Sequence, residues 1–426
     1  MLDIKFIREH PDEIKQNIKK KFQEDRIPLV DKLLKADEQH RKLMQESQEL
    51  RHKRNMMSEE INKLKKEGKP ADKQLKEVKA IPDRIAKIEQ EQAELANTIH
   101  ECLFLIPNMI HSSVPIGKDE TKNVEIKKIG KVKKFAFEVV NHAELCENLR
   151  IADFEAAART SGKGFYFLTG LLAQLDMALI NYARDYMIKQ GYLYVEPPWM
   201  IKQHILTGVY SSREIAAMSY KIEGEDLFLI ATSEHPLIGM YVDAVIHKKN
   251  LPVKLTAFSP CFRKEVGSHG LDEKGLFRTH QFNKQEMVVI CHPDDSYKYY
   301  DEMLNHTINI FKGLGIPIRV LESCSGDLGD LKAKGCDVEA WSPRQKKYFE
   351  VCSLTNMEAA QARRLNIKVQ DGNEKYFAHT LNNTVIATSR AMVAILENFQ
   401  NKDGSVDIPE VLWQYMHGIK KITKQE

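Results

Sequence analysis

Apolar positions between residues 30 and 66 recur at alternating steps of three and four, which predicts a helix with a heptad seam. Polar side chains interrupt that seam at His40, Ser47 and Arg54. The other seam positions are Leu33, Ala36, Leu43, Leu50, Met57, Ile61 and Leu64. After the Gly-Pro break "EGKPAD" (67–72), a second helical stripe follows at Leu75, Val78, Ile85, Ile88, Leu95 and Ile99. Two long helices joined by a tight turn predict an antiparallel coiled-coil hairpin that projects as an arm. Pro82 predicts a kink or break in the second helix.

The pattern changes near residue 105. The Pro/Gly/Ser-containing segment "LIPNMIHSSVPIGKDE" (105–120) is typical of a linker. Beyond it the sequence predicts a helix at 167–190 and a second helix that begins near Thr388 or Ser389, either of which can cap it. Strands are predicted at 192–200 (broken by Pro197 and Pro198), 226–234, 253–266, 275–290 and 316–323. The run "MVVI" (287–290) lacks alternation, which favours a sheet buried on both faces.

These elements predict an α+β fold in which helices flank an antiparallel β-sheet domain and an antiparallel α-helical coiled-coil arm precedes it. We expect a helical domain at 1–105, a linker at 106–120 and the sheet domain at 121–426, which the resemblance described below identifies as catalytic. The chain has 426 residues, of which 42% are apolar and 29% charged. It contains no apolar run long enough to span a membrane. Its seven cysteines are scattered and form no C-x-x-C pair, which is typical of reduced thiols in a cytoplasmic protein.

The net charge of +3 is too small to indicate a nucleic-acid partner, but charge gathers at the predicted hairpin tip. Residues 63–79 hold seven lysines against Glu67, Asp72 and Glu77, a local net charge of +4. A solvated hairpin used for dimerisation or as a spacer accounts for this composition. A basic tip that grips a phosphate backbone accounts for it equally. The arm alone leaves both interpretations open.

Five chemically distinctive side chains follow one another at a step of two in "GLFRTHQFNKQE": Arg278, His280, Phe282, Lys284 and Glu286. On a strand, alternate residues share a face, and Arg263 and Glu265 of the preceding strand do so as well. A solvent-exposed polar face is one explanation. A ligand with phosphates, a flat ring and an amine is the other, because arginine binds phosphate, an aromatic ring stacks on a purine and a buried carboxylate pairs with an ammonium. ATP with an amino acid fits this set.

Arg390 falls in the first turn of the helix predicted near Thr388. The helix macrodipole disfavours a cation there by ~0.3–1 kcal/mol, and a bound anion reverses that sign. Together with the strand pair, Arg390 therefore becomes a candidate phosphate ligand.

The segments "FRKE" with "GLFRTHQFNKQE", and later "LNNTVIATSRAMVAILEN", resemble motifs 2 and 3 of the class II aminoacyl-tRNA synthetases, in the form found in seryl-tRNA synthetases. "GYLYVEPPWM" (191–200) is similar to their motif 1. The resemblance runs from "MLDIKFIREHP" to "ENFQNKDGSVDIPEVLWQY" and covers nearly the whole chain. It implies an ATP-dependent, AMP-forming serine–tRNA ligase that makes seryl-adenylate from L-serine and transfers the serine to the 3′ end of tRNA(Ser). It also implies a homodimer, Mg²⁺ and a hairpin that contacts the long variable arm of the tRNA, and it leaves the charging of tRNA(Sec) open.

The same resemblance assigns roles to residues. Arg263 and Arg390 become catalytic: Arg263 binds the α-phosphate and the serine carboxylate, and Arg390 binds the γ-phosphate with Arg278. Phe282 stacks on adenine, and Glu265 contacts the adenine end. The ATP site also contains Lys264, Thr279, Glu350, Val351, Cys352 and Ser353. The serine site consists of Thr232, Glu234, Arg263, Glu286, Asn382 and Thr384. Glu350 and Ser353 are the implied Mg²⁺ ligands.

Three departures from the family pattern put details in doubt, and one of them is Pro82 in the arm. Met357, Glu358 and Ala359 replace a run that is usually more polar or aromatic, which affects the pocket floor. Val266 and His269 replace smaller residues in the motif 2 loop.

Other functions fit the sequence less well. A ligase for a carrier protein would usually lack the arm, and a non-catalytic tRNA-binding paralogue is expected to lose Arg263, Glu286 or Arg390. A structural coiled-coil protein leaves residues 226–400 unexplained.

Overall fold

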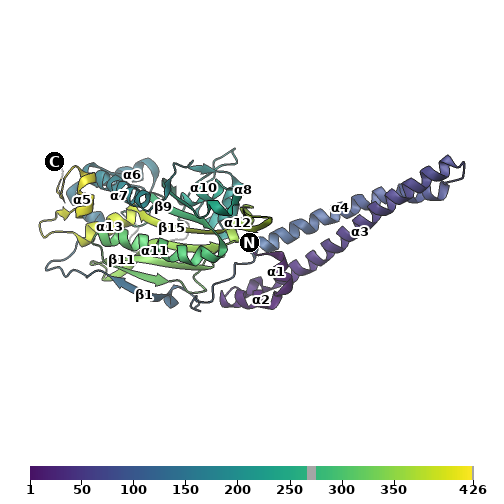
Figure 1. Cartoon of the computed structure of the whole chain (residues 1–426). Helices are drawn as coiled ribbons and strands as arrows, with labels where there is room; N and C mark the ends of the chain where they lie inside the picture. The colour runs from purple at the N-terminus through teal and green to yellow at the C-terminus, as the bar shows by residue number, and fades with distance from the viewer. Residues whose placement is uncertain (266–274, 425–426) are drawn as a thin grey trace. The chain divides into compact units, whose positions relative to one another are not determined.

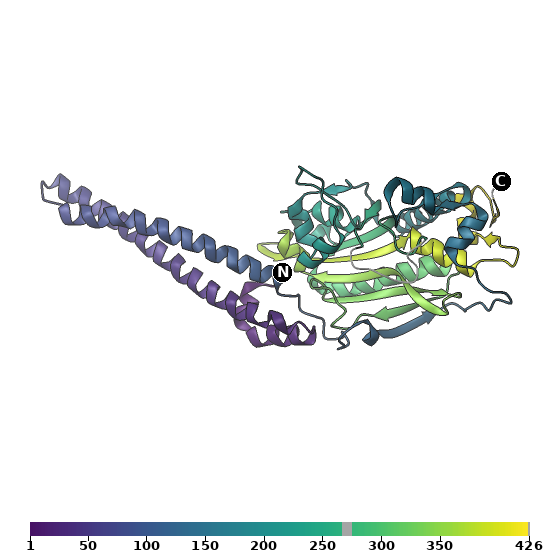
Figure 2. The same cartoon turned by 180° about the vertical axis from the view of Figure 1, so that it is seen from behind.

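The N-terminal residues fold as helices. A computed structural model describes residues 1–265 and 275–424, and these divide into two units, Leu2–Pro107 and Asn108–Glu426 together with Met1. The first unit contains α1 (Ile4–Glu9), α2 (Pro11–Lys20), α3 (Ile27–Lys66) and α4 (Asp72–Leu105). The two long helices α3 and α4 lie antiparallel, side by side, and join at a tight turn (Figures 1 and 2). The predicted hairpin is therefore present.

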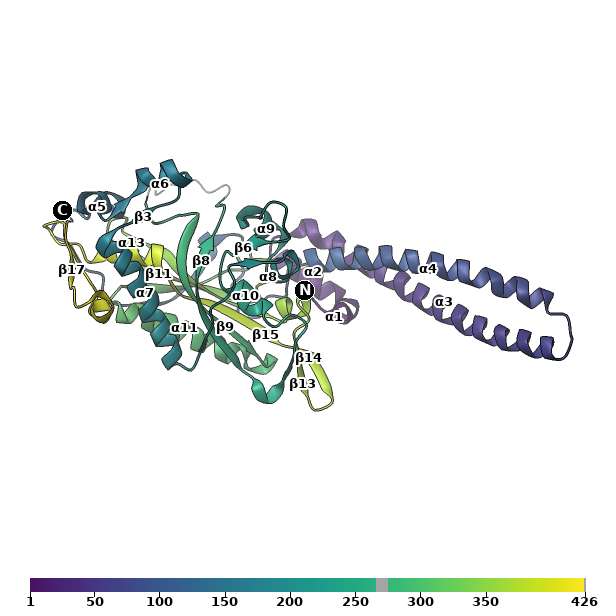
Figure 3. The same cartoon turned by 90° about the horizontal axis from the view of Figure 1, so that it is seen from above.

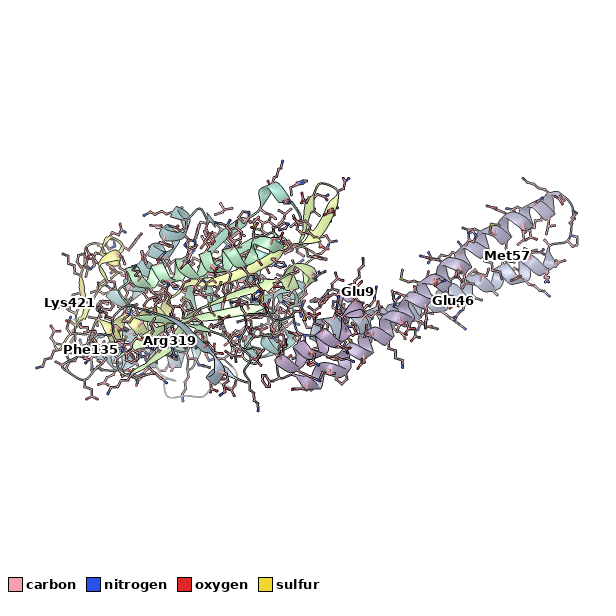
Figure 4. All side chains as sticks on the ribbon, turned by 60° about the horizontal axis from the view of Figure 1, so that its bottom comes forward. Glu9, Glu46, Met57, Phe135, Arg319 and Lys421 are labelled. Carbon is pink, nitrogen blue, oxygen red and sulfur yellow. The ribbon has the colours of Figure 1, made fainter. Side chains whose placement is uncertain are left out.

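The seam between α3 and α4 follows the predicted heptad. Met57 packs with Ile81 and Ile85 in a small apolar cluster, whereas the seam position Arg54 is exposed. Ion pairs flank the seam: Arg84 Nε donates to Glu46 Oε1 at 2.8 Å, and Arg51 Nη2 donates to Glu89 Oε1 at 2.7 Å. Glu46 and Met57 are labelled in Figure 4. Because exposed ion pairs contribute little, burial of the apolar seam holds the hairpin together.

The break predicted at Pro82 is wrong, because α4 is continuous from Asp72 to Leu105. Pro82 lies on the exposed side of the helix, between the buried residues Ile81 and Ile85. Packing of these two isoleucines against α3 keeps the helix intact although proline removes one backbone hydrogen bond.

We expect Pro82→Ala to slow amide hydrogen exchange in residues 75–90 by roughly 10–100-fold, because proline costs about 3 kcal/mol in a helix interior. Hydrogen exchange followed by mass spectrometry on the full chain measures this. Asp83→Ala, at the next exposed position, is the control and leaves the exchange rates nearly unchanged. Equal exchange rates in the proline-containing and Pro82→Ala chains would contradict the explanation.

The second unit is built on an eight-stranded sheet with the order β1-β10-β11-β12-β15-β9-β8-β4. Every neighbouring pair is antiparallel except β4 and β8. The strands are β1 (Val124–Ile129), β10 (Ile318–Glu322), β11 (Lys334–Ser342), β12 (Lys347–Glu358), β15 (His379–Ala387), β9 (Gln281–Cys291), β8 (Val253–Phe262) and β4 (Leu193–Tyr194). Figure 3 shows β8, β9 and β15 side by side. The predicted α+β class is confirmed.

Helices cover both faces of this sheet. One face packs on α7 (Gly170–Lys189), α11 (Ser296–Gly313), α13 (Thr388–Asn398) and α5 (His142–Leu149). The other face packs on α8 (Gln203–Val209), α10 (Glu234–Gly239) and α12 (Ala360–Arg364). In β9, Met287, Val289 and Cys291 enter the first core, and Val288 and Ile290 enter the second. The predicted two-sided burial of this strand is therefore confirmed.

Shorter elements complete the unit. The helices are α6 (Phe154–Ser161) and α9 (Ser212–Met218). The short strands are β2 (Ala152–Asp153), β3 (Phe167–Leu168), β5 (Met200–Ile201), β6 (Phe228–Leu229), β7 (Val245–His247), β13 (Lys368–Asp371), β14 (Glu374–Phe377), β16 (Val406–Asp407) and β17 (Lys421–Ile422). No helix in the described parts of the chain is long and apolar enough to cross a membrane.

Several predicted boundaries differ from those observed. β8 ends at Phe262 and β9 begins at Gln281, so Arg263 and Arg278 lie just outside the paired strands. The run 226–234 contains only the two-residue β6, and α10 already begins at Glu234. Ala387 precedes α13 and no side chain caps that helix, so the cap predicted at Thr388 or Ser389 is wrong. Val266 and His269 lie outside the described residues.

Candidate active site

A cavity of about 220 Å³ opens on the α8/α10 face of the sheet. Its floor is made by alternate residues of three neighbouring strands, because side chains of one parity share a face. These are Lys284 and Glu286 of β9, Asn382 and Thr384 of β15, and Ser353, Thr355 and Met357 of β12. The walls are Val209, Tyr210, Glu214, Met218, Thr232, Glu234, Arg263, Gly329, Leu331, Lys332 and Glu350. All six predicted serine-site residues and both predicted metal ligands therefore line one cavity.

A second cavity of about 60 Å³ shares four lining residues with the first: Arg263, Lys284, Glu350 and Thr384. Its other lining residues are Glu265, Phe277, Arg278, Thr279, Phe282, Val351, Cys352, Ala387, Ser389 and Arg390. The predicted ATP-site residues thus gather here, apart from Ser353, which lies in the first cavity, and Lys264. The Lys264 amide donates to Met218 O at 3.0 Å, and its ammonium lies 5.8 Å from the Tyr220 ring, outside both cavities' linings.

Glu286 is the most buried acid of the cavity floor. Its side chain is 2% exposed and forms an ion pair with Lys284, which is 6% exposed. The Thr384 hydroxyl donates to Glu286 Oε2 at 3.4 Å, since register places these residues opposite one another on β15 and β9. A buried charge requires a partner of opposite charge, and Lys284 supplies it.

Glu234 is the second buried acid of the cavity. Its Oε1 accepts from Gln361 Nε2 at 2.7 Å and from Asn382 Nδ2 at 3.0 Å, and its amide donates to Thr232 Oγ1 at 3.2 Å. Burial, and secondly the nearby Glu286 carboxylate, raise the pKa of Glu234 to about 7. An approaching ammonium group would favour its ionised form.

Two of the arginines that line the second cavity are Arg263 and Arg390, and Arg263 lines the first as well. The Arg263 guanidinium lies 5.1 Å from the Phe282 ring centroid, and the Arg263 amide donates to His280 O at 2.9 Å. Arg390 Nη1 donates to the Glu350 carbonyl at 2.8 Å and to Glu350 Oε2 at 2.9 Å. Its guanidinium also lies 5.3 Å from the Phe277 ring. Cations and aromatic rings in this arrangement suit a purine nucleotide with its phosphates.

Glu350 and Ser353 offer oxygen donors, which Mg²⁺ prefers. Burial favours a raised pKa for Glu350, but Arg390, together with Arg263 and Lys332, outweighs it and lowers that pKa. The carboxylate is therefore held ionised. No group of three acidic, histidine or cysteine side chains in the described residues could hold a metal by itself. The two donors fit an ion that arrives with a polyphosphate, since Mg²⁺ usually takes few protein ligands and keeps phosphate oxygens.

Sequence reasoning assigned no role to three polar residues of this network, although it had named Lys284 among the side chains at a step of two. Lys284 neutralises Glu286, and its place at a step of two from Glu286 was the available signal. Asp337 lies opposite Ser353 in the β11–β12 register, and burial, followed by Glu350, raises the pKa of Asp337 to about 7. Gln361 donates a hydrogen bond to Glu234, which lies 127 residues earlier in the chain, so no local sequence pattern indicates this contact.

The three neighbouring residues that depart from the family pattern, 357–359, have different surroundings in the structure. Met357 is buried and lines the first cavity. Glu358 instead accepts from the Tyr297 hydroxyl at 2.7 Å, and Ala359 begins α12 as its N-cap. Among these three residues only Met357 therefore reaches the cavity.

Comparison with known proteins agrees with this geometry. Residues 219–399 match the tRNA synthetase class II core domain (G, H, P, S and T), and residues 1–110 match the seryl-tRNA synthetase N-terminal domain. The serine–tRNA ligase of Methanospirillum hungatei is 47% identical over 98% of this chain and 99% of that protein. The serine–tRNA ligase of Pyrococcus horikoshii is 42% identical over 100% of this chain and 98% of that protein. The chain belongs to the seryl-tRNA synthetase family.

Solved structures of this family match the fold. The crystal structure of the Pyrococcus horikoshii seryl-tRNA synthetase complexed with ATP has a TM-score of 0.96 at 42% identity and covers 100% of both chains. The cytoplasmic serine–tRNA ligase of Naegleria fowleri in complex with AMP has a TM-score of 0.89 at 32% identity and covers 100% of this chain and 99% of that one. The seryl-tRNA synthetase resemblance predicted from the sequence is confirmed.

Proposed function

We propose that the chain activates L-serine with ATP in the two joined cavities and transfers the serine to tRNA(Ser). The observation that carries this proposal is the juxtaposition of two buried acids, Glu234 and Glu286, with the arginine-lined second cavity. A charging assay tests it: labelled serine is incubated with ATP, Mg²⁺ and tRNA(Ser), beside alanine, threonine and cysteine. Serine alone is expected to become attached to the tRNA, and the attachment of another amino acid instead would overturn the proposal.

In the activation step, a serine carboxylate oxygen attacks the α-phosphorus of ATP, and the bond to the pyrophosphate oxygen breaks. The products are seryl-adenylate and pyrophosphate. No side chain has to transfer a proton, so placement and charge neutralisation carry the step. Arg263 lines both cavities and contacts the serine carboxylate and the α-phosphate, while Arg278 and Arg390 hold the γ-phosphate. Mg²⁺, held by Glu350 and Ser353, supplies further neutralisation of the phosphates when it is bound.

The remaining ATP contacts follow from the second cavity. Phe282 stacks on adenine, Glu265 contacts the adenine end, and Thr279, Val351 and Cys352 line the nucleotide. Lys264 is the exception among the assigned residues, since its side chain lies outside the cavity linings.

Serine recognition depends on buried polar groups. Glu286 and Thr384 bind the hydroxyl, and Thr232, Glu234 and Asn382 surround the amine. Alanine lacks the hydroxyl that would bond Glu286 and Thr384, and sites built to bond a substrate hydroxyl reject analogues without it by roughly 10⁴-fold or more.

We expect the KM for serine to fall as pH rises from 6 to 8. The pKa of Glu234 is raised to about 7, so the carboxylate that receives the serine ammonium ionises across this window. Pyrophosphate exchange at several serine concentrations and pH values measures the effect. Glu234→Gln is expected to raise KM and flatten its pH dependence, and an unchanged profile in that variant would refute the role of Glu234.

The proposals that the chain binds the tRNA variable arm and forms a homodimer concern surfaces outside the two cavities. All seven lysines of residues 63–79 are exposed, which suits phosphate contacts with the tRNA variable arm. Exposed apolar side chains on and around α7, β4 and β5 favour a homodimer: Phe167, Met177, Ile188, Leu193, Trp199 and Met200. All seven cysteines are free, as expected in the cytoplasm.

A further inference from the structure

Part of the first cavity has no role in binding serine or ATP. The residues that line the first cavity but not the second include Met218, Leu331, Lys332 and Met357. Three of these side chains are apolar and flexible or branched, and the fourth is a cation. The serine and ATP contacts proposed above use other residues throughout.

Lys332 is held in place by its backbone. It follows a turn in which its amide donates to Gly329 O at 3.1 Å, and the next amide, of Ala333, donates to Asn356 O at 2.9 Å on β12. The Lys332 side chain passes close to Gly329, because a Cβ added to that glycine would lie 3.7 Å from both Cδ and Cε of Lys332. The side chain therefore starts from a fixed point just before β11 and lines the first cavity.

The Lys332 ammonium makes no hydrogen bond or ion pair with any residue that the structure describes. The neighbouring cations differ: Lys284 is paired with Glu286, and Arg390 with Glu350. The Lys332 charge acts on the Glu350, Asp337 and Glu234 carboxyls without bonding any of them. A half-buried cation with no ion pair of its own in a cavity is suited to an anion that arrives with a substrate. The candidate anions are the serine carboxylate, the phosphates of ATP and the phosphodiesters of tRNA.

Two of these anions already have partners. The serine carboxylate faces Arg263, and the ATP phosphates face Arg278 and Arg390 in the second cavity, which Lys332 does not line. The phosphodiester beside the terminal nucleotide of tRNA is left, and that nucleotide has to enter the first cavity for its ribose to reach the serine carbonyl. Met218 and Met357 offer it polarisable, adaptable contacts of the kind that pack well on aromatic rings.

We propose that Lys332 binds the phosphodiester next to the 3′-terminal nucleotide of tRNA, while Met218, Leu331 and Met357 pack against the terminal base. This inference rests on the proposed function and concerns its transfer step. There the terminal ribose hydroxyl attacks the serine carbonyl carbon, and the bond between that carbon and the phosphate oxygen of AMP breaks with its electron pair staying on AMP. The hydroxyl proton passes to the departing AMP phosphate or to solvent. Lys332 positions the nucleophile and does not touch the reacting atoms.

The test compares two half-reactions of the full-length chain. Serine-dependent pyrophosphate exchange reports activation, and single-turnover transfer from preformed seryl-adenylate to subsaturating tRNA(Ser) reports the second step. In Lys332→Gln, transfer is expected to fall about tenfold more than exchange, because a charge-assisted contact to phosphate is lost. Saturating tRNA recovers much of the rate, and Lys332→Arg restores most of it.

Lys334→Gln is the matched control. The Lys334 ammonium bonds Glu322 at 3.0 Å and the Ser113 hydroxyl at 2.7 Å, outside the cavity lining, so this variant keeps the ratio of transfer to exchange. Equal losses of exchange and transfer in Lys332→Gln would assign Lys332 to activation and overturn the proposal, as would unchanged transfer. Absence of exchange in the unsubstituted chain would instead refute the proposed function, and this inference with it.

Discussion

Arg263→Ala is expected to lower serine-dependent pyrophosphate exchange by about 10²–10³-fold, because it removes preorganised donors aimed at the charge that develops on the α-phosphate. Arg263 lines both cavities, and its guanidinium sits against the Phe282 ring. Loss of this one side chain therefore affects the serine carboxylate and the nucleotide together. Arg263→Lys is expected to recover little, since an ammonium cannot reproduce the planar fork of donors.

Arg319→Ala provides the matched control for Arg263→Ala. Arg319 is on β10, three strands from β15, and bonds Glu339 and Glu125 rather than a cavity residue (Figure 4). We expect this variant to retain exchange within about twofold, since neither Arg319 nor its partners Glu339 and Glu125 line the two cavities. Substantial exchange in Arg263→Ala, or an equal loss in Arg319→Ala, would contradict the role given to Arg263.

Glu286→Ala is expected to abolish serine activation and to lower the free energy of unfolding by about 3–5 kcal/mol. The substitution leaves the Lys284 ammonium buried without its partner, and it removes the group that receives the serine hydroxyl. Exchange at high serine concentration and denaturant unfolding measure the two effects separately.

The double variant Lys284→Met with Glu286→Leu separates charge burial from serine recognition. Replacing both members of a buried ion pair with apolar side chains is often nearly neutral, so stability is expected to return close to that of the unsubstituted chain. Exchange is expected to stay absent. Recovery of exchange in the double variant would show that Glu286 acts only through stability.

Much of this site was predictable from the sequence, because strand alternation is a local property. The step of two between Phe282, Lys284 and Glu286 placed them on one face of β9, and that face is the cavity floor. The likeness of the remaining motifs to a known family then supplied Arg390, Thr384 and Glu234. The structure brings all of these together around the two cavities.

What the sequence could not predict depends on tertiary contacts. Gln361 reaches Glu234 because α12 packs beside α10 and β15, and residues so far apart leave no local pattern. Lys332 lies in the connection between β10 and β11, and only the folded structure shows that it lines the first cavity. Pro82 failed as a helix breaker because Ile81 and Ile85 on either side are buried in the seam. Packing overrides local preference at such positions.

Serine-dependent exchange of labelled pyrophosphate into ATP tests the central claim most directly, since it reports adenylate formation without tRNA. The measurement compares serine with alanine, threonine and cysteine, with Arg263→Ala as the inactive reference. Exchange with serine alone, lost in the variant, is the predicted result. Exchange with a different amino acid would keep the mechanism and overturn the roles of Glu286 and Thr384. No exchange with any amino acid would contradict the enzymatic function and favour a tRNA-binding paralogue.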